Sequence, residues 1–392
     1  MPWEETTKME LKQQFINEML LYQMPFSHLC EKYGISEKTG YKWKKRFLEY
    51  GNAGLLDQSR QPLCHPNQID GDTAAELIAL KLAHSAWGPK KIRELYSRSY
   101  PNKETPSLSS VKRILDKAGL VVKRKIRKSA GSDCPRLQQP IQAHAPNDVW
   151  CIDFKGWWKS DGEVCEPLTV RDKFSRKILC VQLMTSKTSD AVKAVMQNVF
   201  KKYGLPKAIH SDNGPPFAAP NGLLNLTVLS AWWITLDILP NRSLKGCPGQ
   251  NGSLERMHAD IAREIEKKIS GGIVGNQKAL DAWVEEYNSV RPNEAIGMKV
   301  PDEMYSISDR KYSGDYDEIE YPIGYLVRKV ASSGEIIIKS ARVNIGLSLR
   351  GLQVGLRANG DNTYDVFLAN FLLGTLDMNS VCFYPLDVLK SK

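Results

Sequence analysis

Several patterns that mark common protein classes are missing from this sequence of 392 residues. Its eight cysteines include no Cys-x-x-Cys pair and its six histidines do not cluster, so a zinc site is not expected. No apolar run reaches membrane-spanning length. The opening residues, MPWEETTKME, lack the basic-then-apolar order of a secretory signal. We therefore expect a reduced, cytoplasmic protein whose thiols serve as small core residues.

Positive charge is concentrated in the first third of the chain. The net charge of the whole sequence is +10, and residues 1–130 hold 23 Lys+Arg against 14 Asp+Glu, a net of +9. This asymmetry suggests a polyanionic partner, most simply nucleic acid, although a solvated basic surface is a common alternative. The length exceeds what one compact core accommodates, so two to four domains are expected.

Residues 1–60 are predicted to form a helix-turn-helix domain. In FSHLCEKYGISEKTGYKWKKRF, a helix over residues 26–33 would end at Gly34, which tolerates a left-handed cap, and Ser36 would cap a second helix. A basic, capped helix after a tight turn suits insertion into a DNA major groove, and an ordinary helical hairpin with a charged face is the alternative. The candidate DNA contacts on this helix are Lys38, Lys42, Lys44, Lys45 and Arg46.

A second helical DNA-binding domain is expected over residues 70–128. ELIALKLAHSAWGPKKIRELY has helical periodicity that Gly88-Pro89 interrupts, and PSLSSVKRILDKAGLV joins a serine cap to an apolar face. The basic run at 123–128 is either a phosphate contact or a solvated linker end. Residues 129–146 lack periodicity and are interpreted as a linker. The candidate DNA contacts in this domain are Lys90, Lys91, Lys112 and Arg113.

Two further domains follow. In residues 147–310, strand-like segments such as VWCIDFKGWW and KILCVQLM are combined with amphipathic helices, which predicts a mixed α/β layer domain. Residues 320–392 contain only short strand-like runs separated by Gly, Asn and Asp, which suggests a small β-barrel with a DNA-binding role. The expected fold class is thus a multidomain chain with all-α helix-turn-helix units, a central α/β core and a C-terminal β-barrel.

Three carboxylates stand at positions that need an explanation. Asp153 lies inside the strand-like VWCIDFKGWW, and burying an isolated carboxylate is costly unless it is paired or binds a cation. Asp212 ends a short strand in HSDNGPPF, where a plain Asx turn is the alternative. Glu255 falls in the first turn of a helix that begins in PGQNGSLER, where the helix dipole alone would favour it.

Together, these three carboxylates are what a site for two Mg²⁺ ions needs. Mg²⁺ prefers carboxylate oxygens, and two such ions about 3.5–4 Å apart can activate an attacking hydroxyl and stabilise a leaving oxygen in phosphoryl transfer. We expect Asp153 to bridge both ions, with Asp212 holding one and Glu255 the other. All three would be both catalytic and metal-binding residues.

Other polar residues near these positions are given structural interpretations. Asp172 begins a turn between two strands. Asp260 and Glu264 lie one and two turns past Glu255 and are expected to be solvated. His258 is expected on the surface of the same helix.

The motifs WCIDFKG, SDNGPPF and PGQNGSLER together resemble the integrase-core transposases, a family that includes the catalytic domain of retroviral integrases and many bacterial insertion-sequence transposases. VRDKFSR, YNSVRPNEAIGMKVPDEMY, YGISEKTGYKWKKRF and GLLDQSRQP are also similar, so the likeness spans most of residues 10–305. The resemblance implies a ribonuclease-H-like fold over residues 147–310. It also implies two Mg²⁺ ions, for which Mn²⁺ can substitute, and DNA cleavage followed by strand transfer. The all-β tail resembles the family's small C-terminal DNA-binding barrel.

The sequence also departs from this family. Forty-two residues separate Asp212 from Glu255, a wider gap than in retroviral integrases, and the retroviral N-terminal zinc site is absent. Many relatives have Lys or Arg two turns after the catalytic glutamate, where this chain has Ala262. Either Arg256 or Arg263 would then make the corresponding phosphate contact.

The predicted function is that of a DNA transposase. It would bind the terminal repeats of its element, free a 3′-OH and join it to target DNA without a covalent protein–DNA intermediate. Holding two ends of double-stranded DNA implies a homo-oligomer, a dimer or tetramer, and the setting would be the bacterial cytoplasm, in association with the nucleoid. Two alternatives stay open: a domesticated helix-turn-helix regulator without catalysis, and a metal-dependent nuclease that cuts site-specifically but never joins.

Overall fold

The computed structural model describes residues 7–57, 69–121, 141–219, 222, 225–243, 252–314 and 319–386. The chain divides into two compact units, residues 1–68 and 69–392. The basic run at 123–128 and most of the predicted linker lie outside the described residues. Among the helices that are described, none is both long and apolar enough to cross a membrane.

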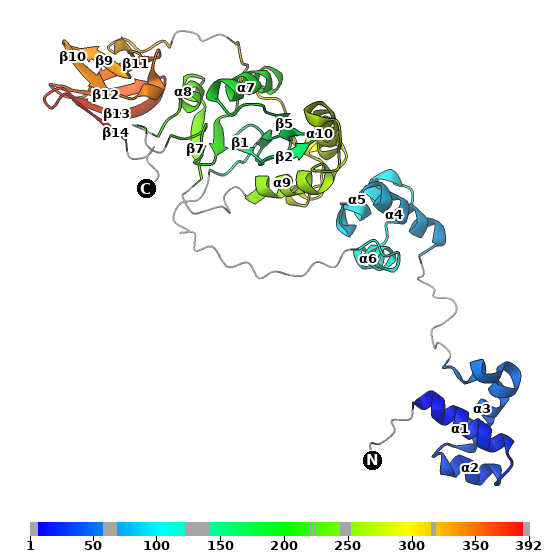
Figure 1. Ribbon diagram of the computed structural model, residues 1–392. Helices are drawn as coiled ribbons and strands as arrows, with labels where there is room; N and C mark the ends of the chain where they lie inside the picture. The colour runs from blue at the N-terminus through cyan, green and yellow to red at the C-terminus, as the bar shows by residue number, and fades with distance from the viewer. Residues whose placement is uncertain are drawn as a thin grey trace. The chain divides into compact units, whose positions relative to one another are not determined.

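The first unit is a small helical domain (Figure 1). Its centre is a cluster of buried apolar side chains. Ser36 accepts a hydrogen bond from the backbone of Thr39, and Gly34 has a φ of +63°, as the predicted turn requires. A Cβ added to Gly40 would stand 2.6 Å from Cys30 Sγ, so only glycine lets the two helices of the motif approach this closely. The helical elements are α1 (Lys8–Leu20), α2 (Phe26–Lys32), α3 (Glu37–Tyr50) and the short 3₁₀ helix η1 (Gly51–Leu55).

The second unit begins with three helices around their own apolar cluster. Pro89 occupies the first turn of the middle helix, and Ser107 caps the third by accepting from the backbone of Ser110. Leu77, Ile92 and Val111 are fully buried among them. The helices are α4 (Gly71–Ala83), α5 (Pro89–Ser99) and α6 (Leu108–Lys117).

A five-stranded mixed sheet follows, with the strand order β5-β4-β1-β6-β7. The neighbours β5, β4 and β1 are antiparallel, whereas β6 and β7 run parallel to β1. Counted along the chain, this order is 3-2-1-4-5, the arrangement expected of a ribonuclease-H-like fold. The strands of the sheet are β1 (Val149–Phe154), β4 (Pro167–Asp172), β5 (Ile178–Leu183), β6 (Ala208–Ser211) and β7 (Leu239–Arg242), and β2 (Trp158–Ser160) pairs with β3 (Glu163–Cys165) in a separate hairpin.

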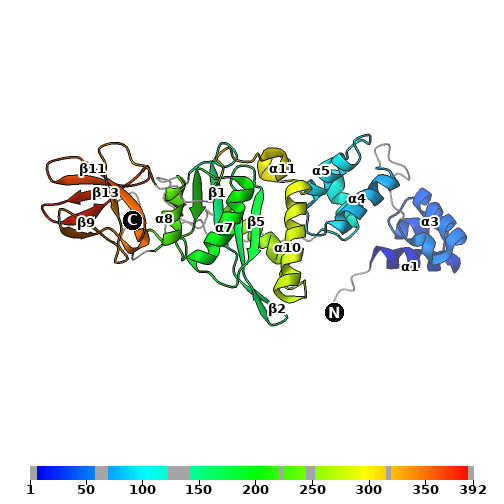
Figure 2. The ribbon, with the colours of Figure 1, turned by 90° about the horizontal axis from the view of Figure 1, so that it is seen from above.

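Helices cover both faces of this sheet, which explains the nearly continuous apolar run in β1. Trp150 and Ile152 face a cluster that includes Phe200 of α7, whereas Cys151 faces the cluster that holds Met257 of α9. Figure 2 shows α10 alongside β5 on the second side. The helices are α7 (Ser189–Tyr203), α8 (Val228–Thr235), α9 (Gly252–Glu264), α10 (Gly272–Ser289), α11 (Pro301–Met304) and the 3₁₀ helix η3 (Glu294–Ile296).

The predicted C-terminal β-barrel is not confirmed. Residues 319–386 form an open antiparallel sheet in the order β14-β13-β12-β11-β8 and a separate β9-β10 hairpin. No ladder closes the sheet among these residues, because β9 and β10 pair only with each other and leave β8 and β14 as edges. The apolar side of the sheet shares its core with Ala231 and Ile234 of α8. The elements are β8 (Leu326–Lys329), β9 (Glu335–Ile338), β10 (Ala341–Asn344), η4 (Leu347–Leu349), β11 (Gln353–Ala358), β12 (Thr363–Leu368), β13 (Phe371–Asp377) and β14 (Cys382–Pro385).

Candidate active site

Two of the predicted carboxylates lie at the carboxyl ends of neighbouring parallel strands. The β1–β6 ladder pairs Cys151 with His210, and continuing this register by two residues sets Asp153 opposite Asp212. Since side chains alternate between the faces of a sheet, both aspartates share the α9 side with Cys151. Strand pairing therefore brings together residues that are far apart in sequence.

The pair is electrostatically strained. Burial and the nearby charge of Asp212 together raise the pKa of Asp153 to about 7, although a 2.8 Å hydrogen bond from the Phe154 N–H opposes the shift. Asp212 Oδ1 is buried and accepts no hydrogen bond within the described part of the chain. A buried carboxylate oxygen without a donor is costly, and a bound cation would satisfy it.

The turn after β6 leaves space beside Asp212 Oδ2. A Cβ added to Gly214 would lie 2.9 Å from Asp212 Oδ2, so a larger residue would crowd that oxygen. Asn213 Nδ2 donates to the carbonyl of Ser243 at 2.6 Å, and Ser243 Oγ lies 3.1 Å from His210 Nε2. These contacts anchor the HSDNGPPF segment to the residue that follows β7.

The first turn of α9, which carries Glu255, is anchored to the sheet. Arg171 of β4 is 2% exposed and donates to the carbonyl and the hydroxyl of Ser253 at 2.8 and 2.6 Å. Thr169 Oγ1 donates to the Asp153 carbonyl at 3.0 Å and lies 2.8 Å from His258 Nε2. His258, predicted on the helix surface, is thus half-buried in a bridge from α9 to β1.

The structure does not assemble all three carboxylates into one compact cluster. Within the ranges described, no group of three His, Cys, Asp or Glu side chains is arranged so that it could hold a metal ion. The Glu255 side chain is exposed, and its charge makes only a small contribution to raising the pKa of Asp153. Asp153 and Asp212 fit a divalent cation as a pair, and Glu255 as third ligand stays a prediction.

The raised pKa of Asp153 predicts an unusual dependence of stability on pH. Without metal, the folded protein binds more protons here than the unfolded chain between pH 3.8 and about 7, so the free energy of unfolding falls as pH rises through this window. The full shift corresponds to about 4 kcal/mol. In chelator, Asp153→Asn should melt higher than wild type at pH 8, and the gap should close near pH 4. Equal melting temperatures at pH 8 would contradict this.

Three acidic residues near the site, Asp172, Asp260 and Glu264, bind partners within the protein. The partners of Asp260 and Glu264 were not predicted. Asp172 accepts hydrogen bonds from the Asn147 N–H and from the N–H and hydroxyl of Ser175, which agrees with a structural role. The prediction that Asp260 and Glu264 are solvated is wrong, because the chain after α10 returns along α9 and buries both against a cation.

That cation is Arg291, whose side chain is 5% exposed. It donates to Asp260 Oδ2 at 2.9 Å and to Glu264 Oε1 at 3.1 Å. Glu264 Oε2 also accepts from Trp283 Nε1 at 2.8 Å, and Arg263 pairs with Asp260. These five residues are called the Arg291 network below.

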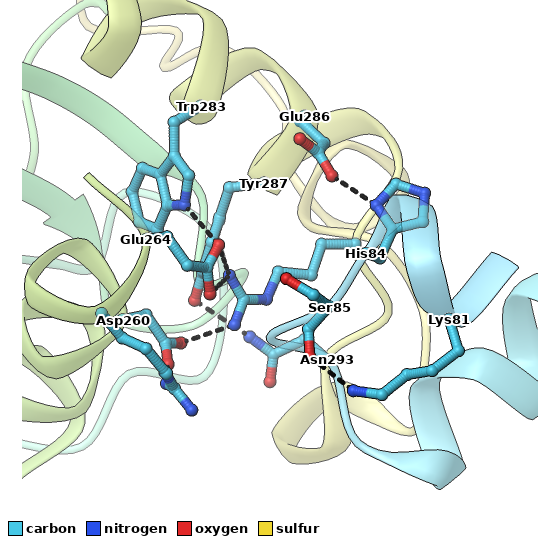
Figure 3. A network of polar contacts seen from close by, with 11 residues as sticks. Lys81, His84, Ser85, Asp260, Glu264, Trp283, Glu286, Tyr287 and Asn293 are labelled. Carbon is cyan, nitrogen blue, oxygen red and sulfur yellow. Dashed lines mark hydrogen bonds and ion pairs between the residues drawn. The ribbon is translucent and has the colours of Figure 1, made fainter. Parts of the chain in front are cut away.

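Ion pairs also join the α4–α6 helices to the core. His84 Nδ1 lies 2.8 Å from Glu286 Oε1 on α10, as Figure 3 shows. Lys90 pairs with Glu294 at 3.1 Å, so this predicted DNA contact has an intramolecular partner in the structure. Lys91 lies close by, and burial lowers its pKa to about 8.

The remaining predicted DNA contacts lie on helix surfaces. Lys38, Lys42 and Lys45 are exposed on α3, and Lys44 and Arg46 are half-buried. Lys112, Arg113 and Arg256 are exposed, whereas Arg263 is partly occupied by its ion pair with Asp260.

Four segments of the chain match known protein families. Residues 11–62 match a family described as "Helix-turn-helix domain", and residues 39–115 match "Homeodomain-like domain". Residues 143–246 and 236–301 match two families that are both described as "Integrase core domain". These matches cover α1–α6 and the central sheet with its helices.

Two relatives of this chain come from bacterial insertion elements. The chain is 26% identical over 279 residues to "Insertion element IS407 uncharacterized 31.7 kDa protein" of Burkholderia multivorans, covering 71% of this chain and 93% of that protein. It is 22% identical to "Insertion element IS476 uncharacterized 39.2 kDa protein" of Xanthomonas euvesicatoria, covering 66% and 71%. A solved structure of the HTLV-2 integrase catalytic core domain in complex with magnesium matches with a TM-score of 0.31 and 16% identity, over 42% of this chain and all of that one. The helix-turn-helix and integrase-core matches, together with the two insertion-element relatives, support an insertion-sequence transposase of the retroviral integrase superfamily.

Proposed function

We propose that this transposase binds the terminal repeats of its element, cleaves to free a 3′-OH, and joins that end to target DNA by two-metal-ion phosphoryl transfer. Asp153, Asp212 and Glu255 would be the ligands of two Mg²⁺ ions, for which Mn²⁺ can substitute. The observation that carries the proposal is the pairing of Asp153 with Asp212 at two parallel strand ends, with a raised pKa on one and an unpartnered buried oxygen on the other.

The chain's own residues prepare this site in three ways. Gly214 leaves the Asp212 carboxylate open toward a ligand. Thr169 and His258 hold the backbone of Asp153 against α9, and Arg171 fixes the turn that carries Glu255. Bound divalent cations would neutralise the carboxylates, activate the attacking oxygen and stabilise the leaving oxygen.

DNA recognition would fall to the helical domains and strand joining to the core. The basic helix α3, capped by Ser36, has the form of a recognition helix that enters a major groove. We assign residues 1–60 and 70–128 to end recognition, 147–310 to catalysis and 320–392 to further DNA contacts. Because two ends must be joined together, a dimer or tetramer is the working form.

A strand-transfer assay tests this function directly. Purified protein is incubated in Mg²⁺ with a labelled fragment that carries the sequence flanking the gene, together with a supercoiled plasmid. Wild type and the surface variant Asp190→Asn should both yield label joined to plasmid, and chelator should abolish the product. Cutting without joining would favour a nuclease. Binding of the fragment without cutting or joining would favour a regulator.

A further inference from the structure

Two adjoining pockets, the first of them beside α9, are lined by several cations. The first, with a volume of about 320 Å³, is lined by Arg171, Arg176 and Arg256, and also by Lys91 of α5. The second, of about 620 Å³, is lined by Lys173, Arg176 and Lys299, and no carboxylate is among its lining residues. Both pockets share Arg176 and Ala295, so the cations follow one continuous path.

The acids in the first pocket do not neutralise these cations. Asp260 pairs with Arg263 and Arg291, and Glu294 pairs with Lys90. Both carboxylates are therefore already compensated by residues outside the row of cations just described.

Arg176 is the centre of the path, and within the described residues its side chain has no hydrogen-bond or ion-pair partner. Its Nε is buried without a hydrogen bond, and across the described residues its guanidinium forms no ion pair. Arg171 is almost completely buried, and its Nε is also unpartnered although its terminal nitrogens hold Ser253. Buried guanidinium nitrogens without acceptors indicate that an anion belongs in this space.

The form of the path fits a chain of anions better than a single one. Guanidinium groups bind phosphate through a planar fork of N–H donors. Two pockets joined at one arginine offer successive positions for neighbouring phosphates, as the backbone of a nucleic acid supplies them. Ala295, exposed and small, leaves the junction open.

The path runs beside the predicted catalytic helix. Ser253, Arg256 and Asp260 line the first pocket at helical spacings of three and four, and Glu255 belongs to the same first turn of α9. A DNA strand that follows the cations would therefore pass within one helical turn of Glu255.

We propose that these two pockets form a phosphate-binding groove, called the Arg176 groove, which holds the backbone of one DNA strand beside α9. The groove presupposes the DNA substrate of the proposed function and adds to it the residues that position the strand. Arg176 binds the phosphate at the junction, Arg256 the one nearer the carboxylates, and Lys173 and Lys299 those farther along the second pocket.

Salt-dependent binding tests the groove. Binding of labelled duplex ends is measured by fluorescence anisotropy in chelator at several salt concentrations, for wild type, Arg176→Gln, Lys299→Gln and Lys201→Gln. Lys201 is the matched control, exposed at the end of α7 on the other side of the sheet. Each groove variant should lose about tenfold in affinity, and the slope of log K against log salt should fall in magnitude by about 0.9. Groove variants that behave like Lys201→Gln would overturn the proposal.

A cross-linking measurement gives a positional readout that does not depend on affinity. DNA carrying a disulfide tether on a single backbone phosphate near the 3′ end should attach to Ala295→Cys and not to wild type, whose Cys382 is also exposed. Equal labelling of both proteins would contradict the groove.

Failure of the groove and failure of the proposed function give different results. Since binding in chelator needs no catalysis, normal strand joining by Arg176→Gln with an unchanged salt slope would remove the groove and leave the transposase. A groove-dependent salt slope in a wild-type protein that joins no DNA would remove the proposed reaction and leave the groove. Arg176→Gln should fold normally, because no partner within the described residues loses a bond to it.

Discussion

Replacing Asp212 or Asp153 with Asn should reduce strand joining by about 10³-fold or more and leave binding of the DNA ends nearly unchanged. The amide keeps the size of the side chain but removes the charge that holds a cation. A metal ion contributes several kcal/mol of transition-state stabilisation, and about 1.4 kcal/mol corresponds to a factor of ten in rate. The basic helix α3 belongs to a different compact unit from the two aspartates, so end recognition should persist in a gel-shift assay.

Glu255→Gln tests whether Glu255 acts together with the two aspartates. The structure leaves Glu255 exposed and outside any three-ligand group among the described residues. A loss as large as that of Asp212→Asn would mean that the first turn of α9 moves toward the aspartates when DNA and metal bind. Asp190→Asn, on the surface of α7, is the control that should join normally. Full joining activity in Asp212→Asn would refute the assignment of the site.

Replacing Arg291 with Met should destabilise the packing of α9 against α10 by about 3–5 kcal/mol, because it leaves Glu264 without a cation and Asp260 with only the more exposed Arg263. The Arg291 side chain is 5% exposed, and it bonds to both Asp260 and Glu264. Hydrogen exchange of peptides from α9 and α10 measures this loss locally, which is preferable in a chain of several domains that need not unfold together.

A compensated variant separates the network's charge from its packing. In the triple variant Arg291→Met, Asp260→Asn, Glu264→Gln, no buried charge is left unpaired, so most of the lost protection should return. The matched surface change Arg350→Met should have little effect, since that side chain is exposed. Protection in Arg291→Met equal to wild type would show that the network contributes no net stability.

Local features of this protein were determined by the sequence itself. Ser36 and Gly34 define the helix-turn-helix because a cap and a left-handed turn depend only on neighbouring residues. Asp153 inside an apolar strand and Asp212 before Asn-Gly were recognisable for the same reason, since each is unusual within its own segment. The short strands after residue 320 could likewise be predicted, but not how they pair.

The contacts between distant segments were decided by the tertiary structure, through the order of the strands and the path of the chain after α10. Only the parallel pairing of β1 with β6 sets Asp153 opposite Asp212, and only the return of the chain after α10 places Arg291 on Asp260, 31 residues away. Arg171 reaches Ser253 across 82 residues, a contact for which the sequence carries no periodic signal. The open C-terminal sheet and the Arg176 groove also depend on contacts between segments that are far apart in the sequence. Contacts between distant segments depend on which strands become neighbours, and the free energy that selects those neighbours comes from burying whole faces together, not from any single motif.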